Sequence, residues 1–146
     1  MNKNNINFQV HRTKESTLIE LVCGLLVLLS FILSIVLFIK VREAGVGMLL
    51  QTGSIGFGVL LMLFLAYKPE TFNIPDNSPA EMFVVTVKFI RYVAVLMSLM
   101  SFGITLNAFL GFNPTVIMAG FGLLLVPLLC WYFHEYIKIK KNRIHE

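Results

Sequence analysis

The chain has 146 residues, of which 57% are hydrophobic and only 14% are charged. A soluble domain carries about 25% charged residues, so this composition indicates an integral membrane protein rather than a soluble domain. The net charge of +4 is small and scattered along the chain, which argues against nucleic-acid binding.

Four apolar stretches are long enough to cross a bilayer, which takes about 20 residues in a helix. We predict spans at about residues 18–39, 47–67, 92–110 and 116–136, with a helical extension of the third span from residue 79. Backbone groups in hydrocarbon must be hydrogen-bonded within the chain, so each span should be a helix. The predicted fold is all-α: an integral membrane four-helix bundle that forms a single domain over residues 1–146.

The first span contains one charged residue, Glu20, close to its start. A charge at the centre of a span costs about 2.5–3.5 kcal/mol on insertion scales, so a carboxylate persists there only for function. Glu20 lies at the mouth of the span, where solvation at the interface is the simpler interpretation. The alternative is proton coupling, because small multidrug exporters, which resemble this chain in span number, need an acidic residue in their first helix.

The connection to the second span, "KVREAGVG", is short, and the second span then carries the glycine-rich run "GSIGFG". This run lacks both the Lys-Ser/Thr pair and the preceding strand of a phosphate-binding loop. Small residues in a span let helices approach closely. We therefore expect helix packing in this span rather than cofactor binding.

A polar segment, "KPETFNIPDNSPAE", separates the second and third spans. Pro69 and Pro75 prevent helix continuation, and the residues from Ser78 to Glu81 form a predicted capping box with proline at the first helical position. The third helix should therefore begin outside the hydrocarbon. Lys88 and Arg91 then fall close to one helix face, from which both can contact anionic headgroups or an acidic partner.

The segment "YKPETFNIP" resembles a motif of the SdpI-related family, a group of small bacterial membrane proteins. In that family an aromatic-Pro-x-x-Phe/Trp-Asn-x-Pro segment often ends the second span, and the matching residues here are Tyr67, Pro69, Phe72, Asn73 and Pro75. Family members usually carry a longer outer loop after the first span, whereas this chain has only "KVREAGVG" there. Immunity to a secreted toxin and signalling through a repressor are known for some members, but the matched residues imply neither.

A tight uncharged turn, "GFNPT", joins the last two spans. Gly111 suits the end of one helix, and Asn113 and Pro114 suit the N-cap and the first turn of the next. Near the end of the fourth span, His134-Glu135 lacks the spacing of an H-E-x-x-H zinc motif. We expect no metal site, no cofactor and no catalytic residues, and hence no enzyme.

The positive residues predict the orientation of the bundle. Ten of the twelve Lys and Arg residues precede the first span, lie between the second and third spans, or follow the fourth span, and only Lys40 and Arg42 lie on the other side. Loops rich in Lys and Arg stay in the cytoplasm. We therefore expect both termini and the polar segment to face the cytoplasm, in a multi-pass protein of a bacterial cytoplasmic membrane.

Together these features favour a non-catalytic membrane protein with a binding, regulatory or immunity-like role. Its expected partners are the lipid bilayer and either another membrane protein or further copies of the chain, and not nucleic acid. Lys88 and Arg91 are the candidate partner or lipid contacts. The alternative function is an ion-coupled or small multidrug-type transporter subunit, in which Glu20 would carry the proton.

Overall fold

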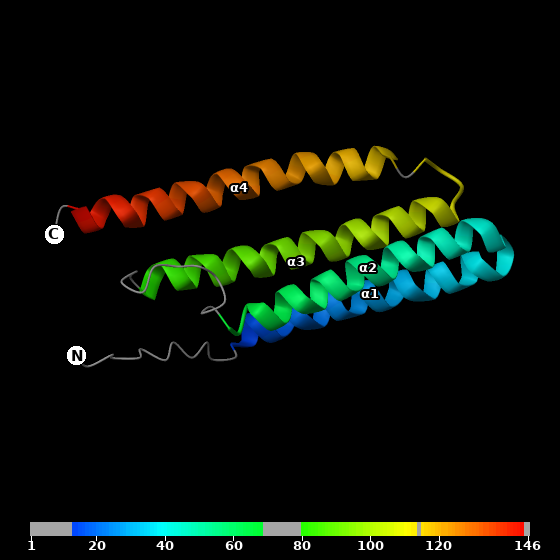
Figure 1. Cartoon of the computed structure of the whole chain (residues 1–146), viewed down its shortest axis with the longest axis horizontal. Helices are drawn as coiled ribbons and strands as arrows, with labels where there is room; N and C mark the ends of the chain where they lie inside the picture. The colour runs from blue at the N-terminus through cyan, green and yellow to red at the C-terminus, as the bar shows by residue number, and fades with distance from the viewer. Residues whose placement is uncertain (1–12, 69–79, 114, 145–146) are drawn as a thin grey trace.

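The computed structural model describes residues 13–68, 80–113 and 115–144. These residues form four helices: α1 (Lys14–Lys40), α2 (Arg42–Leu65), α3 (Ala80–Phe109) and α4 (Thr115–Ile144). All four helices are long and apolar enough to cross a membrane. Successive helices run in opposite directions along the length of the molecule (Figure 1), so the predicted all-α four-helix membrane bundle is confirmed.

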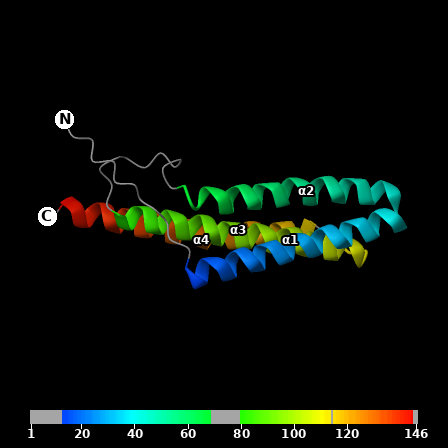
Figure 2. The same ribbon diagram turned by 90° about the horizontal axis from the view of Figure 1, so that it is seen from below.

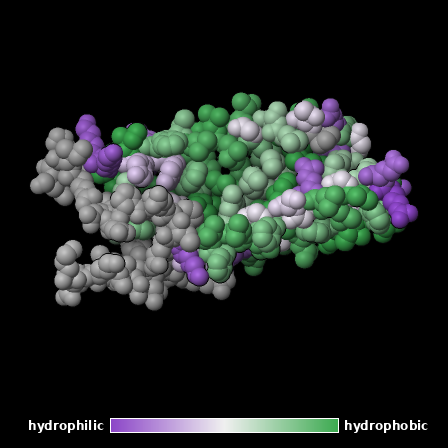
Figure 3. Space-filling view, viewed as in Figure 1, coloured by the Kyte–Doolittle hydropathy of each residue, from purple (hydrophilic) through white to green (hydrophobic). Residues whose placement is uncertain are grey.

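The start of α1, the end of α2, the start of α3 and the end of α4 lie toward one end of the bundle (Figure 1), which we call the lysine-rich end. Its exposed lysines are Lys14, Lys68, Lys88, Lys138, Lys140 and Lys141. The opposite end carries Lys40 and Arg42, which are also exposed. Between the two ends the visible surface is mostly hydrophobic (Figure 3), which suits contact with lipid.

Helix α1 begins earlier than the hydropathy of the sequence indicates, at Lys14 rather than near residue 18. Thr13 caps it, because the Ser16 backbone N–H donates to Thr13 Oγ1 (3.2 Å) and the Thr13 N–H donates to Ser16 Oγ (2.9 Å). Helix α4 likewise continues through polar residues to Ile144. Outside the hydrocarbon, polar residues do not prevent helix formation, so hydropathy marks the span and not the whole helix.

The connection between α1 and α2 is tighter than predicted. Only Val41 interrupts the two helices, with an extended backbone (φ −139°, ψ 93°), and most of "KVREAGVG" is helical. Gly45 is buried in this corner, where an added Cβ would lie 2.1 Å from the Cα of Phe38. Glycine therefore permits a backbone approach that a residue with a Cβ would block.

Helices α1, α2 and α3 contact one another and form the core of the bundle (Figure 2). Their buried faces repeat at heptad spacing and are built largely from small or polar side chains, which lets the helices approach closely. Helix α1 buries Ser16, Cys23, Ser30 and Leu37, and α2 buries Gly45, Thr52 and Val59, with Ala66 buried at its C-cap. The facing residues of α3 are Val87, Arg91, Ala94, Ser98, Ser101 and Thr105.

Helix α4 lies at the edge of the bundle and packs mainly against α3 (Figure 1). None of the residues in its most apolar 18-residue window is buried. Near the α3–α4 turn, a Cβ added at Gly103 would lie 3.2 Å from Ile117 Cγ2. Toward the lysine-rich end, the rings of Phe89 and Tyr132 stack with their centroids 4.4 Å apart.

The turn between α3 and α4 has the predicted features. Gly111 has a φ of 79°, and the Thr115 N–H donates to Asn113 Oδ1 (3.0 Å), as an N-cap requires. The Asn107 amide also donates to the Asn113 carbonyl (3.0 Å). Pro114 and residues 69–79 lie outside the described residues. The second range includes Ser78 and Pro79 of the predicted capping box and most of the "YKPETFNIP" motif.

Candidate functional site

Three helices bring Glu20, Tyr67 and Arg91 together toward the lysine-rich end, and we call these three residues the mouth cluster. The Tyr67 hydroxyl donates a hydrogen bond to Glu20 Oε1. The Arg91 guanidinium lies over the other part of the same tyrosine, with its Cζ 5.5 Å from the ring centroid. Tyr67 therefore contacts an anionic and a cationic side chain at once.

The position of each member follows from the helix that carries it. Glu20 lies between Ser16 and Cys23, both fully buried, on the inner side of α1. Tyr67 lies two residues beyond Leu65, the last residue of α2, and its N–H donates to the Phe64 carbonyl (3.1 Å). Arg91 lies on the α3 face that also buries Val87 and Ala94. The cluster thus forms where α2 ends against α1 and α3.

Arg91 is the charged side chain that the structure buries most deeply among the described residues, at 9% exposure. Its Nε and Nη2 atoms are buried and have no hydrogen-bond partner among those residues. A cation over an aromatic face gains about 2 kcal/mol when the pair is desolvated. That gain does not satisfy the two N–H groups, each of which carries a desolvation cost of its own.

Lys88 and Arg91, which were both expected to contact headgroups or a partner, differ in exposure. Lys88 is exposed, whereas Arg91 is buried between helices. Three residues rotate a helix by about 300°, so the two side chains point about 60° apart, and the edge of the packed face of α3 falls between them. Lys88 remains a candidate contact for headgroups or a partner, and Arg91 belongs to the interior.

Glu20 is intermediate in exposure and hydrogen-bonded to Tyr67, so it lies against the helices rather than in open solvent. The sequence indicated its depth, at the mouth of the first span, but not these neighbours. Tyr67 was expected only as the end of the second span and as part of the family motif. The predicted topology places the segments that carry Glu20, Tyr67 and Arg91 at the same end of the bundle. This shared position was the signal from which their proximity could have been predicted.

Hydroxyl groups line the interior beyond the mouth cluster, and most are hydrogen-bonded nearby. Ser34 and Thr52 bond to each other across α1 and α2 (2.9 Å). The hydroxyls of Ser30, Ser98 and Thr105 each donate to the carbonyl four residues earlier in the same helix. Ser101 Oγ is buried without a partner among the described residues. Of these hydrogen bonds, the one between Ser34 and Thr52 links two helices, and none of these groups bears a charge.

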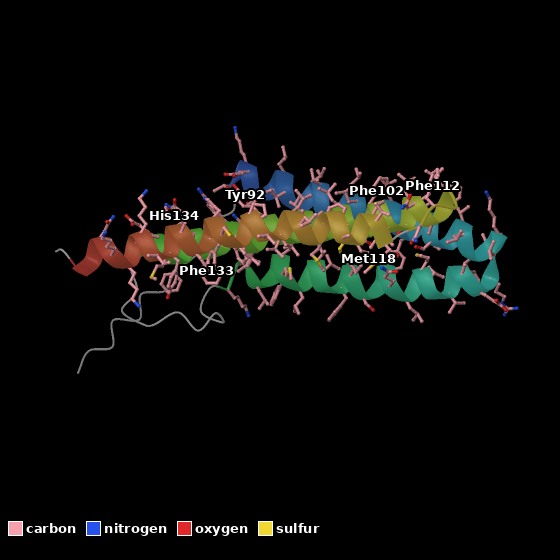
Figure 4. All side chains as sticks on the ribbon, turned by 90° about the horizontal axis from the view of Figure 1, so that it is seen from above. Tyr92, Phe102, Phe112, Met118, Phe133 and His134 are labelled. Carbon is pink, nitrogen blue, oxygen red and sulfur yellow. The ribbon has the colours of Figure 1, made fainter. Side chains whose placement is uncertain are left out.

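Aromatic side chains cluster around the junction of α3 and α4 on the same end. Tyr132 stacks on Phe89 and lies 3.4 Å from the Thr86 hydroxyl, and Tyr92 lies 6.0 Å from Trp131 between ring centroids. His134 is exposed on α4 beyond them (Figure 4). Within residues 13–68, 80–113 and 115–144, no three His, Cys, Asp or Glu side chains are grouped to hold a metal ion.

The arrangement is chemically suited to binding. It offers a buried guanidinium with two unpaired donors, a tyrosine ring in contact with that guanidinium, and a carboxylate hydrogen-bonded to the hydroxyl of the same tyrosine. Comparison of the chain with models of known families, with curated proteins and with solved structures finds no match.

Proposed function

We propose that this chain is a multi-pass protein of a bacterial cytoplasmic membrane that acts by binding, in a regulatory or immunity-like role, and not by catalysis or transport. The observation that carries the proposal is the one-sided placement of charge inside the bundle. Among the described residues, the charged side chains between α1, α2 and α3 are Glu20 and Arg91, and both belong to the mouth cluster. A binding protein needs access from one side only.

A coupled carrier needs an ionisable group that each side of the membrane reaches in turn. Here the hydroxyls between the mouth cluster and the opposite end are mostly bonded within their own helices or to each other. They serve helix packing and carry no exchangeable charge. This distribution favours a receptor-like bundle over a carrier.

An ion-coupled transporter is the second candidate, and one observation favours it. Glu20 is bonded to Tyr67 within the helix interface, where a carboxylate can exchange a proton during a transport cycle. In such a transporter, the site that carries the proton would be the mouth cluster itself. The position of that cluster at one end is the argument against this reading.

A flux measurement separates the two functions. Purified protein is reconstituted into vesicles that hold a pH-sensitive dye, and a pH gradient is imposed across the membrane. We expect wild-type protein and Glu20→Gln to dissipate the gradient no faster than protein-free vesicles do. Dissipation by the wild type that Glu20→Gln abolishes would replace the binding proposal with the transporter.

Binding itself is tested at Lys88, which is exposed at the lysine-rich end. A cation there suits an acidic partner or anionic headgroups, at about 1 kcal/mol per cation. A photoreactive residue placed at position 88 in cells should form a covalent adduct with a partner protein. The same residue at Lys40, exposed at the opposite end, is the matched control and should form none. Equal adducts at both positions, or none at either, contradict the proposal.

The resemblance of "YKPETFNIP" to the SdpI-related motif adds membership of that family to the proposal. Tyr67, the first residue of that match, is the centre of the mouth cluster. The matched residues imply neither immunity nor signalling, so the binding role rests on the placement of charge and not on this resemblance.

A further inference from the structure

We propose that the unpaired edge of the Arg91 guanidinium binds a phosphate oxyanion that arrives from the lysine-rich end. This inference rests on the proposed binding function and names the class of ligand that the mouth cluster takes. The phosphate belongs either to the headgroup of an anionic lipid or to a soluble phosphate, and the chemistry of recognition is the same for both.

The geometry of the two unpaired nitrogens carries the argument. Nε and Nη2 lie on the same edge of the planar guanidinium, and both are buried without a hydrogen-bond partner among the described residues. Two parallel N–H groups on one edge match two oxygens of a phosphate or carboxylate, which they bind in a bidentate manner. A lysine at this position would offer a point charge without that fork.

The Tyr67 ring contacts the guanidinium of Arg91 and leaves its Nε–Nη2 edge without a hydrogen bond. The distance between the ring centroid and Cζ is 5.5 Å, and this contact helps to hold the guanidinium in place. Tyr67 is itself held, because its hydroxyl donates to Glu20 Oε1. The mouth cluster therefore orients the fork before a ligand arrives, which lowers the entropy cost of binding.

The balance of charge and desolvation favours an anion over a water molecule at this edge. A buried cation with unpaired donors is expensive, and an oxyanion both pairs the donors and compensates the charge. Lys68 and Lys88 are exposed at the same end and raise the local concentration of anions. Phosphodiesters of lipid headgroups also lie at the level where a membrane-spanning bundle meets water.

The proposal requires an entry route to the Arg91 edge, which we place at the end of α2. Tyr67 and Lys68 lie beyond its last helical residue and are joined to it by turn hydrogen bonds, from Tyr67 N–H to the Phe64 carbonyl and from Lys68 N–H to the Leu65 carbonyl. These two residues have left the continuous helical ladder. Because the Arg91 edge is buried, an oxyanion reaches it only if this turn moves, and such a movement does not require unfolding of a helix.

The experiment uses delipidated full-length protein in a neutral detergent, with the ionic strength held constant by sodium chloride. Three additions are compared by thermal unfolding: inorganic phosphate, micelles containing phosphatidylglycerol, and micelles containing a neutral glycolipid without phosphate. Stabilisation by inorganic phosphate assigns the site to soluble phosphate. Stabilisation by phosphatidylglycerol, but by neither inorganic phosphate nor the glycolipid, assigns it to an anionic headgroup.

Two variants decide whether Arg91 is responsible. Arg91→Lys keeps the positive charge but loses the two parallel N–H donors. It should weaken binding of the stabilising ligand by about tenfold or more. Lys40→Gln removes an exposed cation at the opposite end of the bundle, and should leave binding of the same ligand unchanged. Equal loss in both variants, or no stabilisation of the wild type by any addition, overturns the proposal.

A measurement on the wild type keeps the test decisive if Arg91→Lys does not fold. In protein labelled with ¹⁵N-arginine, the buried Nε–H of Arg91 should exchange slowly with solvent, unlike that of the exposed Arg42. Addition of the stabilising phosphate compound should shift this slow resonance. A resonance that does not move shows that no oxyanion reaches the Arg91 edge, whatever the flux or cross-linking results.

Discussion

Gly45 allows α1 and α2 to meet across a single intervening residue. An added Cβ would lie 2.1 Å from the Phe38 Cα and 2.5 Å from its backbone nitrogen, and neither atom can move without moving the helix. Gly47 lies two residues further along α2, and a Cβ there would meet nothing within 4 Å. The two glycines therefore form a matched pair for a test of this corner.

Gly45→Ala should destabilise the bundle by at least about 1–3 kcal/mol, as overpacking does, even though alanine is the better helix former. Gly47→Ala should be neutral or slightly stabilising, because it gains helix propensity without a clash. Thermal unfolding in one detergent checks both variants. Equal stability of the two would mean that α1 and α2 are not as close at this corner as described.

The hydrogen bond between Ser34 and Thr52 is the buried side-chain link between α1 and α2 (2.9 Å). In a double-mutant cycle, Ser34→Ala and Thr52→Val should show a coupling energy of about 0.6 kcal/mol, the average for such bonds in membranes. Unfolding in mixed detergent micelles measures the four free energies. Strictly additive effects would show that the two hydroxyls do not interact.

At the scale of single residues, the sequence indicated which charged residues lie at the lysine-rich end, but not how they pair. Charge bias alone assigned Glu20, Lys88 and Arg91 to one end. Their separation into an exposed Lys88 and a buried Arg91 depends on which face of α3 packs against α1 and α2. That face is set by small residues on three helices together, so no single helix pattern could reveal it.

At the scale of helices, α4 differs from the other three because its membrane-spanning part is held by one neighbour. The stack of Tyr132 on Phe89 is a principal contact near the lysine-rich end. Tyr132→Ala should loosen α4 from α3 and lower the free energy of unfolding. An aromatic pair contributes about 0.5–1.5 kcal/mol, and the loss should exceed this value because buried area is lost as well.

Phe133 provides the control for that prediction. It is 57% exposed on the adjacent position of α4 (Figure 4), so Phe133→Ala should change the stability far less. Far-ultraviolet circular dichroism during thermal unfolding, with both variants in the same lipid–detergent mixture, makes the comparison. A larger loss for Phe133→Ala would mean that α4 presents a different face to α3.

The existence of all four helices could be predicted from apolar length, whereas two features of their arrangement could not. The break at Val41 follows from the close approach of Gly45 to Phe38, which is a contact and not a propensity. The edge position of α4 was hidden because a helix that is apolar all round shows no preferred buried face. The turn residues Gly111 and Asn113 were predictable, since a positive φ and an N-cap each have a residue preference.

At the scale of the whole molecule, the bundle is polarised along its length. Positive residues gather at the end that also holds the mouth cluster, and apolar side chains cover the surface between the two ends (Figure 3). If the lysine-rich end faces the cytoplasm, as the excess of Lys and Arg indicates, then a ligand or partner of the mouth cluster comes from inside the cell. The proposed binding function depends on this orientation.

Cysteine accessibility in intact cells tests that orientation most directly. In a background of Cys23→Ser and Cys130→Ser, single cysteines are introduced as Val41→Cys at the opposite end and Lys141→Cys at the lysine-rich end, both at exposed positions. A membrane-impermeant maleimide should label Val41→Cys in intact cells, and Lys141→Cys only after the membrane is permeabilised. Labelling of Lys141→Cys in intact cells, with Val41→Cys protected, would place the mouth cluster outside the cytoplasm and contradict the account.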